Sequence, residues 1–446
     1  MKRKRSRRAR LVASACFWAV LALGIPFDRA AAFEDMEVPA FVANVKKPED
    51  YPGQGGIWMG RDRHVRVDGM GGMEITEHLI ARVFDPGWAE RNFAPYSRLY
   101  WAYPTRGAVD RARVWKSSAE FRDVPMSSIV DRPAPIAHGL ASLDYLRECA
   151  IDFGALEPGD VVEVRLKWAI PFHVRIPDLR FCADVFGAAE PIVEQQLRIE
   201  GPSTLRMNAE VFGPAPLRRA YPKDGSYWEV FLAGNLPAMQ GTFVETPNAR
   251  FVEAGDSTVA GMTRVVVTSA GNWGFVSSVL APAWKEAGAY RSPVMDQWVA
   301  GVLAESKSDL EKARALARLV KEKVRPLEVP HVHTGILPLP PAAIVADGRA
   351  TPRDRSLLLA TLLQMAGVAA TPVAARTSRG PWDPDVPCLL ELDRSLVRVS
   401  LSGGGYAWFD LHEEASDTPP TLGLPFDPSA EGFDRVKLLP IPVIEE

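Results

Sequence analysis

Four residues in the last third of the chain have side chains suited to acyl-transfer chemistry. Cys388 and Ser356 are potential nucleophiles, while His412 and Asp410 are a potential base and its orienting carboxylate. A nucleophile, a base and a carboxylate within hydrogen-bonding reach make up a hydrolase triad. Each residue also has a structural interpretation: Cys388 as a buried thiol, Ser356 as a packed or capping hydroxyl, His412 as a surface histidine, and Asp410 as a partner of the backbone or of an arginine.

Metal chemistry has one candidate in the sequence. His331 and His333 form a His-x-His pair, and on a strand both rings would point to one side and could hold a metal ion. No third ligand is evident nearby, so a role in a loop or in the core is favoured. We expect no metal site and no cofactor.

The elements that would position these residues begin with a β-rich region. From about residue 55 to residue 270 the pattern is short, alternating and interrupted by turns, as in the segment VVEVRLKW after Pro158-Gly159-Asp160. Its apolar residues share one face of a strand: Val162, Val164, Leu166 and Trp168. We therefore predict an antiparallel β-sandwich region within residues 33–270.

The pattern becomes helical after Trp273. Ser308 to Glu311 forms a capping box, and apolar residues then recur at helical spacing until Pro326 ends the helix. A second, strongly apolar helix is predicted within 348–368, GRATPRDRSLLLATLLQMAGV, followed by the candidate strands TPVAART, SLVRVSL and YAWFDL. The linker SGGG predicts a hairpin between the last two strands. Residues 271–446 are thus expected to form an α+β domain, which makes the whole chain α+β.

The order and spacing from Trp273 to about Ala415 resemble the transglutaminase-like family, which belongs to the papain-type cysteine hydrolases. In that family a Gly-Asp-Cys-x-Asp motif opens a buried helix, a histidine begins a later strand, and an aspartate ends the next strand. The matching segments here are GILPLPPAAIVADG, RDRSLLLATLLQMAGVAATPV, LDRSLVRVSL and YAWFDL. The resemblance places the cysteine position at Pro352, the trailing aspartate of the motif at Asp354, the histidine position at Arg394 and the orienting aspartate at Asp410.

The N-terminal region resembles the β-rich domain of unknown function that commonly precedes transglutaminase-like domains in exported bacterial proteins. The segments that carry this resemblance are DGMGGMEITEHLIARVF, FGALEPGDVVEVRLKW, EPIVEQQLRI, WEVFLAGNLPA and GNWGFVSSVLAPAW. They imply the architecture of the protein more than an activity.

Two of the three catalytic groups of the family are replaced in this chain. Proline offers no nucleophile, and arginine stays protonated and cannot serve as a base. Pro352 also fits a stable helix start, because Thr351 is a favourable N-cap, proline is favoured at the first helical position, and Asp354 completes a Thr-x-x-Asp capping pattern. The resemblance therefore implies a degenerate domain, a pseudoenzyme that binds or scaffolds a peptide, an envelope polymer or a partner protein. The alternative is an active hydrolase or acyltransferase whose nucleophile has moved to Cys388 or Ser356.

Basic residues gather around the predicted helix start. Arg349, Arg353 and Arg355 lie in or beside its first turn, and Arg394 would face the same cleft. A helix N-terminus favours anions, so four cations there become favourable only if Asp410 or a bound anion lies among them. Solvated surface arginines are the simpler interpretation, and an anion or ligand cleft is the alternative.

The N-terminus predicts export. Seven basic residues within MKRKRSRRAR precede the apolar run Leu11 to Phe27 and then Ala30-Ala31-Ala32, as in a signal peptide that is cleaved after about residue 32. An uncleaved membrane anchor is the less favoured alternative. Residues 1–32 hold eight basic and one acidic residue, so the remaining chain carries 44 basic and 54 acidic residues. This acidic balance argues against nucleic acid as a partner, and we expect a periplasmic or extracellular protein without a transmembrane segment after cleavage.

Two further features have open interpretations. Cys149 and Cys182 lie beside strand-like segments and would either form a disulfide or remain two buried thiols. Tyr100, Trp101 and Tyr103 in RLYWAYP would either pack between sheets or offer aromatic faces to a glycan.

Overall fold

The fold is mixed α+β, as the sequence predicts, with several largely antiparallel sheets. The computed structural model describes residues 37–69, 72–101, 105–144, 146–170, 181–204, 207–223, 225–241, 243–246, 249–252, 262–327, 337–376, 383–412, 422–426 and 439–440. Residues 38–446 belong to one compact unit, and the predicted signal peptide lies outside the described residues. Within the described part, no helix is long and apolar enough to cross a membrane.

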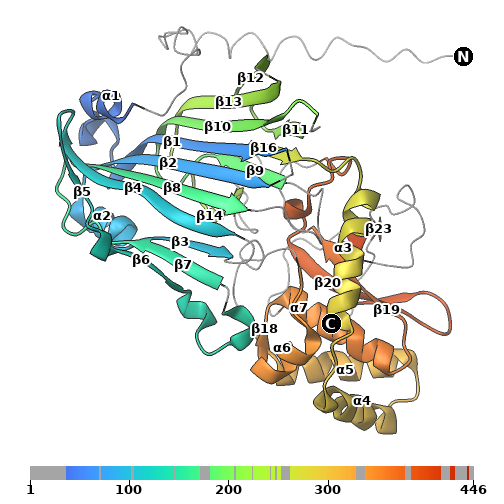
Figure 1. Ribbon diagram of the computed structural model, residues 1–446. Coiled ribbons are helices and arrows are strands. Elements are labelled where there is room, and N and C mark those ends of the chain that lie inside the picture. Colours follow the sequence, from blue (N-terminus) through green and yellow to red (C-terminus); the bar gives the residue numbers. More distant parts are fainter. Residues whose placement is uncertain are drawn as a thin grey trace, which may run out of the picture. The chain divides into compact units, whose positions relative to one another are not determined.

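An eight-stranded sheet dominates the described part of the N-terminal region (Figure 1). Its order is β12 (Leu217–Lys223), β13 (Ser226–Leu236), β10 (Ile192–Pro202), β1 (Gly56–Val67), β2 (Met73–Val83), β8 (Val161–Ile170), β4 (Arg106–Ser117) and β5 (Glu120–Asp123). Neighbouring strands are antiparallel except for β1 and β10, which run parallel with Trp58 opposite Ile192. The prediction of antiparallel strands is confirmed for the other neighbours in this sheet, and the parallel pair of β1 and β10 joins strands that no local pattern connects.

Two smaller sheets complete the β-rich region. One has the order β11 (Asn208–Phe212), β16 (Thr263–Thr268), β9 (Phe181–Phe186), β15 (Ala249–Val252) and β14 (Phe243–Thr246); the other has the order β3 (Tyr96–Trp101), β7 (Leu146–Ile151) and β6 (Ile129–Pro133). The predicted apolar face of β8 is buried and shares one hydrophobic core with residues of both smaller sheets. Trp168, which is 1% exposed, packs in that core, so the alternation read from VVEVRLKW is confirmed.

The helices follow the β-rich region in the chain, apart from the short α1 (Val38–Ala43) and α2 (Pro86–Phe93). They are α3 (Trp273–Gly288), α4 (Pro293–Glu305), α5 (Asp309–Lys323), α6 (Pro341–Asp347) and α7 (Pro352–Met365). The capping box of α5 is present, with Ser308 and Glu311 bonded reciprocally, and the helix ends before Pro326 as predicted. The sheet of this part has the order β21 (Tyr406–Asp410), β20 (Arg394–Ser400), β19 (Ala370–Ala375), β22 (Leu422–Pro425) and β23 (Leu439–Pro440).

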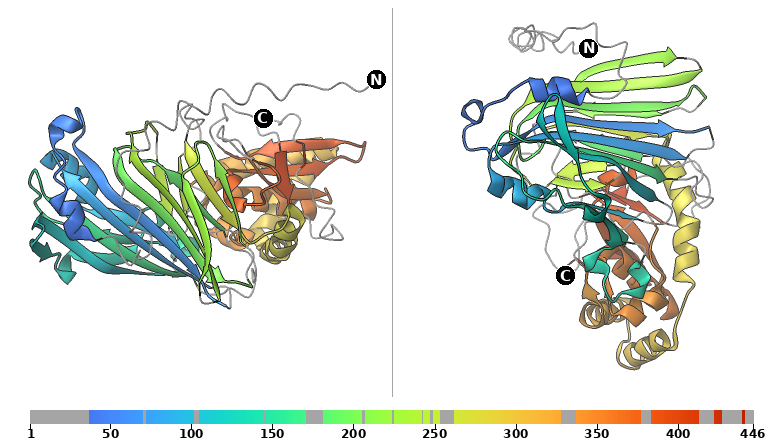
Figure 2. Two further views of the ribbon diagram at one scale, coloured as in Figure 1. Left: turned by 90° about the horizontal axis from the view of Figure 1, so that it is seen from above. Right: turned by 60° about the vertical axis from the view of Figure 1, so that its left-hand side comes forward.

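Helix α7 is buried over most of its length, which explains its apolar composition. Its residues 354–363 are all buried, and it contacts α5, α6, β19 and β20. Figure 2 shows the orange helices against the orange-red strands of this sheet. Two short strands, β17 (Arg325–Pro326) and β18 (Arg349–Ala350), pair in parallel, and this pairing fixes the position of the chain just before α7. Gly348 closes α6 with φ +63°, a left-handed conformation that glycine adopts without strain.

A segment of the β-rich region takes part in the helical core. The connection between β6 and β7 contains two short 3-10 helices, η4 (Pro135–Ala137) and η5 (Ala141–Leu143), and η5 contacts α6. Ala134, Ala137, Leu140, Leu143 and Leu146 belong to the same buried cluster as residues of α4, α5 and α7. The predicted domain boundary near residue 270 stays a prediction. Residues of this segment, which precede the boundary in the sequence, pack against helices that follow it.

The alternatives for the cysteines and the aromatic cluster are resolved in part. Cys149 on β7 and Cys182 on β9 are both unbonded and buried, so the suggested disulfide is wrong and two buried thiols are present.

Tyr100 is 4% exposed, and its hydroxyl donates to Asp131 (2.7 Å) while its ring packs beside Trp168. Tyr100 is therefore an interior residue and not part of a glycan platform. The Trp101 side chain and Tyr103 lie outside the described residues.

Candidate functional site

The start of α7 carries the capping arrangement that its sequence predicts. Thr351 is the N-cap, with its hydroxyl accepting a hydrogen bond from the Asp354 backbone N–H (3.3 Å), and Pro352 occupies the first helical position. Proline loses no helical hydrogen bond at that position, because the first N–H groups of a helix have no partner within it. The residue at the family's cysteine position therefore stabilises the helix start.

Asp354 ties the same helix start to the preceding loop. Its carboxylate accepts from the Thr351 hydroxyl (2.6 Å) and from the Leu339 backbone N–H (2.9 Å), and Arg353 approaches it at 3.5 Å. The Asp354 side chain is fully buried. Its oxygens are thus used to hold the loop before α6 against the first turn of α7.

A second group of residues lies at the end of the β20–β21 hairpin. Arg394, the first residue of β20, forms an ion pair through its Nε with the carboxylate of Asp410, the last residue of β21. The other Asp410 oxygen receives both the backbone N–H of His412 (2.9 Å) and the Nδ1 of His412 (2.7 Å). Burial opposes ionisation of Asp410, but the hydrogen bonds and charge of His412 and the charge of Arg394 outweigh it and hold the pKa of Asp410 below its usual range.

One hydroxyl joins the two groups. The Ser356 side chain, one turn into α7, contacts the carbonyl oxygen of Pro352 (2.9 Å) and the carbonyl oxygen of Ser395 (3.2 Å). Ser395 follows Arg394 on β20, so the helix start lies against the beginning of this strand. The structure therefore brings Pro352, Arg394 and Asp410 into one neighbourhood, which we call the degenerate site because the family resemblance predicts a triad at these positions and two of its groups are replaced.

The four arginines near the helix start have different surroundings. Arg355 is 0% exposed within the packed domain, Arg353 pairs with Asp354, and Arg394 pairs with Asp410. Arg349 is half-buried on β18. Fixed carboxylates therefore accompany Arg353 and Arg394, and the interpretation of all four as solvated surface residues is wrong.

Neither candidate nucleophile lies in a reactive setting. Cys388 is 0% exposed, and burial raises the pKa of its thiol far above that of an accessible cysteine. Ser356 is also fully buried, and no contact between its hydroxyl and a basic side chain is seen among the described residues.

No metal site is apparent in the described part of the chain, where no group of three metal-ligating side chains is found. The candidate pair His331 and His333 lies outside the described residues.

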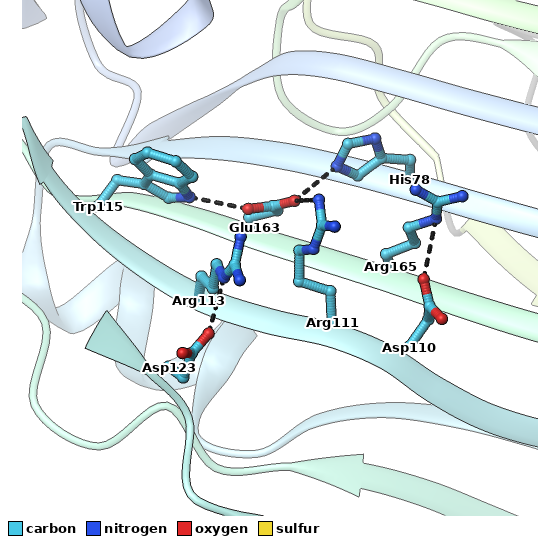
Figure 3. A network of polar contacts seen from close by, with 8 residues as sticks. All are labelled: His78, Asp110, Arg111, Arg113, Trp115, Asp123, Glu163 and Arg165. Atoms are coloured by element: carbon cyan, nitrogen blue, oxygen red, sulfur yellow. Dashed lines mark hydrogen bonds and ion pairs between the residues drawn. The ribbon is translucent and has the colours of Figure 1, made fainter. Parts of the chain in front are cut away.

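The sequence did not reveal a second polar centre, on the large sheet (Figure 3). Glu163 of β8 accepts hydrogen bonds from Trp115 Nε1 of β4 (2.9 Å) and Arg111 Nη1 of β4 (3.2 Å), and contacts His78 Nε2 of β2 (3.1 Å). These residues lie on the face opposite the apolar face of β8, yet Glu163 is 0% and His78 is 2% exposed. The sequence does show a carboxylate, Glu163, between Val162 and Val164 in a predicted strand. The alternation that predicts the strand does not reveal which residues of other strands contact this carboxylate.

The comparisons with known proteins concern the fold. No family model and no curated protein matches this chain. A crystal structure described as a "putative protease" from Parabacteroides distasonis is similar with a TM-score of 0.69 and 12% identity, over 87% of this chain and 72% of that chain. An M1 zinc metallopeptidase from Deinococcus radiodurans aligns with a TM-score of 0.26 and 13% identity, over 48% of this chain and 42% of that chain. The first likeness shows a shared fold, and the second is too weak to support any inference.

Proposed function

We propose that this chain is an exported, transglutaminase-like pseudoenzyme that binds or scaffolds a peptide, an envelope polymer or a partner protein. The observation that carries the proposal is the replacement of both reactive groups by residues that are built into the fold. Pro352 forms the capped start of α7, and Arg394 neutralises Asp410. The framework of helix and strands is retained around them, which supports binding without turnover.

The loss of chemistry follows from these side chains. A proline ring has no proton to give up and no lone pair to attack a carbonyl, and a guanidinium stays protonated at physiological pH. Removal of the nucleophile or the base of a hydrolase triad lowers turnover by a factor on the order of 10⁶. Asp410 alone cannot replace them, because its oxygens accept from Arg394 and His412.

Turnover is the first test of this proposal. The mature protein is incubated with a fluorescent primary amine and a glutamine-containing protein, and separately with peptides, and product formation is followed by mass spectrometry. We expect no product from the protein or from Asp410→Ala. Turnover by the unaltered protein that Asp410→Ala abolishes would overturn the pseudoenzyme proposal.

An electrophilic probe tests the alternative of a displaced nucleophile. We expect iodoacetamide and a fluorophosphonate to leave Cys388 and Ser356 unlabelled in the folded protein, because both side chains are fully buried. Labelling of Cys388 after unfolding in urea serves as the positive control for the thiol probe. Stoichiometric labelling of either residue in the folded state would favour an active enzyme.

Binding is tested with Arg394→Ala and Arg353→Ala. Acidic peptides and fragments of envelope polymers are titrated into the protein by calorimetry at low and at high salt. If the degenerate site binds an anionic group, Arg394→Ala weakens binding at least several-fold, and the difference shrinks as salt screens the charges. Unchanged affinity in both variants would remove this site as the binding surface.

Export is tested separately by N-terminal sequencing of the protein from the cell envelope. The proposal expects a mature chain that begins near residue 33, as the basic, apolar and small-residue segments of residues 1–32 predict. Recovery of the intact N-terminus from a cytoplasmic fraction would contradict it.

A further inference from the structure

His412 and Arg394 contact the same carboxylate. The pairing of β20 with β21 ends at Leu396 opposite Asp410, and Arg394 and His412 each lie two residues beyond that pair at the same end of the hairpin. Asp410 contacts Arg394 through one oxygen and His412 through the other. An imidazole is therefore present beside the position that lacks one.

Asp410 holds this imidazole in a defined orientation. One carboxylate oxygen contacts both the backbone N–H and the Nδ1 of His412, at 2.9 and 2.7 Å, while the other oxygen pairs with Arg394. Because the hydrogen bond to an ionised carboxylate requires a proton on Nδ1, the neutral form of His412 carries its lone pair on Nε2. This is the way a carboxylate orients a histidine base in a triad.

The His412 side chain is partly accessible, unlike Ser356 and Cys388. It is 21% exposed, whereas the Asp410 and Arg394 side chains are 14% and 11% exposed. The charged side chains that meet at this point are His412 and Arg394, which both contact Asp410. The imidazole is thus the more exposed member of a charged group that is otherwise largely buried.

We propose that His412 is the proton-accepting residue of the degenerate site, held by Asp410 as a positioning residue, and that its Nε2 accepts a hydrogen bond from an N–H or O–H group of the ligand. This inference deepens the proposed function, since it adds a hydrogen-bond acceptor to a site that has no nucleophile. The tests below do not depend on turnover, so they can fail independently of the pseudoenzyme proposal.

The first test identifies the tautomer of His412 by NMR with ¹⁵N-labelled histidine, assigned through His412→Gln. In the unaltered protein we expect the neutral ring to carry its proton on Nδ1, which faces Asp410. Asp410→Ala removes the acceptor and should lower the share of this tautomer, whereas Arg394→Gln keeps the carboxylate and should preserve it. The same tautomer distribution in all three proteins, or the opposite tautomer in the unaltered protein, would overturn the role of Asp410.

The second test introduces a thiol at the helix start. In Pro352→Cys, an adjacent imidazole should favour the thiolate and accelerate alkylation by iodoacetamide at pH 6.5. Adding His412→Gln should then slow alkylation at least tenfold. Gln364→Cys, at the exposed C-terminal end of the same helix, should be insensitive to His412→Gln. An alkylation rate of Pro352→Cys that does not depend on His412 would show that His412 does not serve this site.

Discussion

The buried carboxylate of Asp354 holds the start of α7 through one local contact and one distant contact. Its carboxylate serves Thr351 within the cap and Leu339 in the preceding loop. The first of these bonds follows from the local Thr-x-x-Asp pattern, and the second depends on a residue 15 positions away. Asp354 therefore stabilises the start of α7 both within the cap and against the loop before α6.

Replacement of Asp354 by alanine should be strongly destabilising. It removes the acceptor of two hydrogen bonds and leaves the buried Leu339 N–H without its partner, so we expect a loss of about 3 kcal/mol in the free energy of unfolding. Urea denaturation followed by circular dichroism measures it. Asp385→Ala, at an exposed position, is the control and should change stability by less than about 0.5 kcal/mol. An equal effect of both variants would contradict the role assigned to Asp354.

The three cysteines within the described residues, Cys149, Cys182 and Cys388, should be unreactive in the folded state. Burial raises the pKa of Cys149 to about 11 and that of Cys182 to about 12, and Cys388 is fully buried. Ellman's reagent should therefore detect almost no thiol in the native protein and three thiols per chain in denaturant without reductant. Detection of a single thiol under denaturing conditions would instead indicate a disulfide.

At the scale of elements, the large sheet contains a charged centre that joins three strands. Glu163 of β8 contacts His78 of β2 and accepts a hydrogen bond from Trp115 of β4. The ion pairs Arg165–Asp110 and Arg113–Asp123 lie on either side of it (Figure 3). Backbone pairing already sets the strand order, so these side chains add a second set of cross-strand bonds on the polar face. A buried carboxylate that keeps its charge is stable only because donors surround it.

Replacing Glu163 should weaken the sheet. Glu163→Ala leaves the buried donors of His78 and Trp115 without an acceptor, and we expect a loss of about 3 kcal/mol in the free energy of unfolding at neutral pH. Asp123→Asn, at the exposed Arg113–Asp123 pair, is the control and should cost less than about 1 kcal/mol. If Glu163→Ala leaves the free energy of unfolding unchanged, the network is dispensable for stability.

The contribution of the Glu163 charge should depend on pH with a definite sign. Burial alone would raise the pKa of Glu163, but the hydrogen bonds from His78, Trp115 and Arg111 and the charge of His78 lower it below the usual 4.5. The stabilisation from ionised Glu163 is therefore fully present above pH 4.5 and is lost as the pH falls through the lower folded-state value. The stability difference between the protein and Glu163→Gln should be constant from pH 7 to about pH 5 and shrink below 4.5. A difference that grows on acidification would contradict this sign.

At the scale of the molecule, a buried carboxylate links the β-rich region to the C-terminal part. Glu391, in the short 3-10 helix η8 (Leu389–Glu391), pairs with Arg376 after β19 (2.6 Å) and with Arg264 of β16 (2.9 Å). The hydroxyl of Thr268 on β16 also donates to the Pro387 carbonyl (3.0 Å). Residues from distant parts of the sequence are thus held together by charge as well as by apolar packing.

Glu391→Ala should reduce the cooperativity of unfolding. Removing one member of a buried ionic group leaves two arginines without this carboxylate and typically costs about 3–5 kcal/mol. We expect one calorimetric transition for the unaltered protein and two resolved transitions for Glu391→Ala. Glu74→Ala removes an exposed pair with Arg66 and should leave a single transition. A single, unshifted transition in Glu391→Ala would contradict the proposed coupling.

The sequence by itself determined the features that depend on neighbouring residues. The alternation of β8, the capping box of α5, the capped start of α7 at Pro352 and the β20–β21 hairpin could all be predicted, because each arises from side chains within a few positions of one another. Combined with the family resemblance, these elements also predict that Pro352, Arg394 and Asp410 lie close together.

Only the tertiary structure decided which distant partners share each buried group. The parallel pairing of β1 with β10, the donors around Glu163 and the bridge at Glu391 join residues that no local pattern connects. The same holds for His412: its nearness to Asp410 is visible in the chain, but the contact of Arg394 with the same carboxylate depends on the pairing of two strands. A buried charge is stable only when its partners come from the whole fold, and local sequence does not specify those partners.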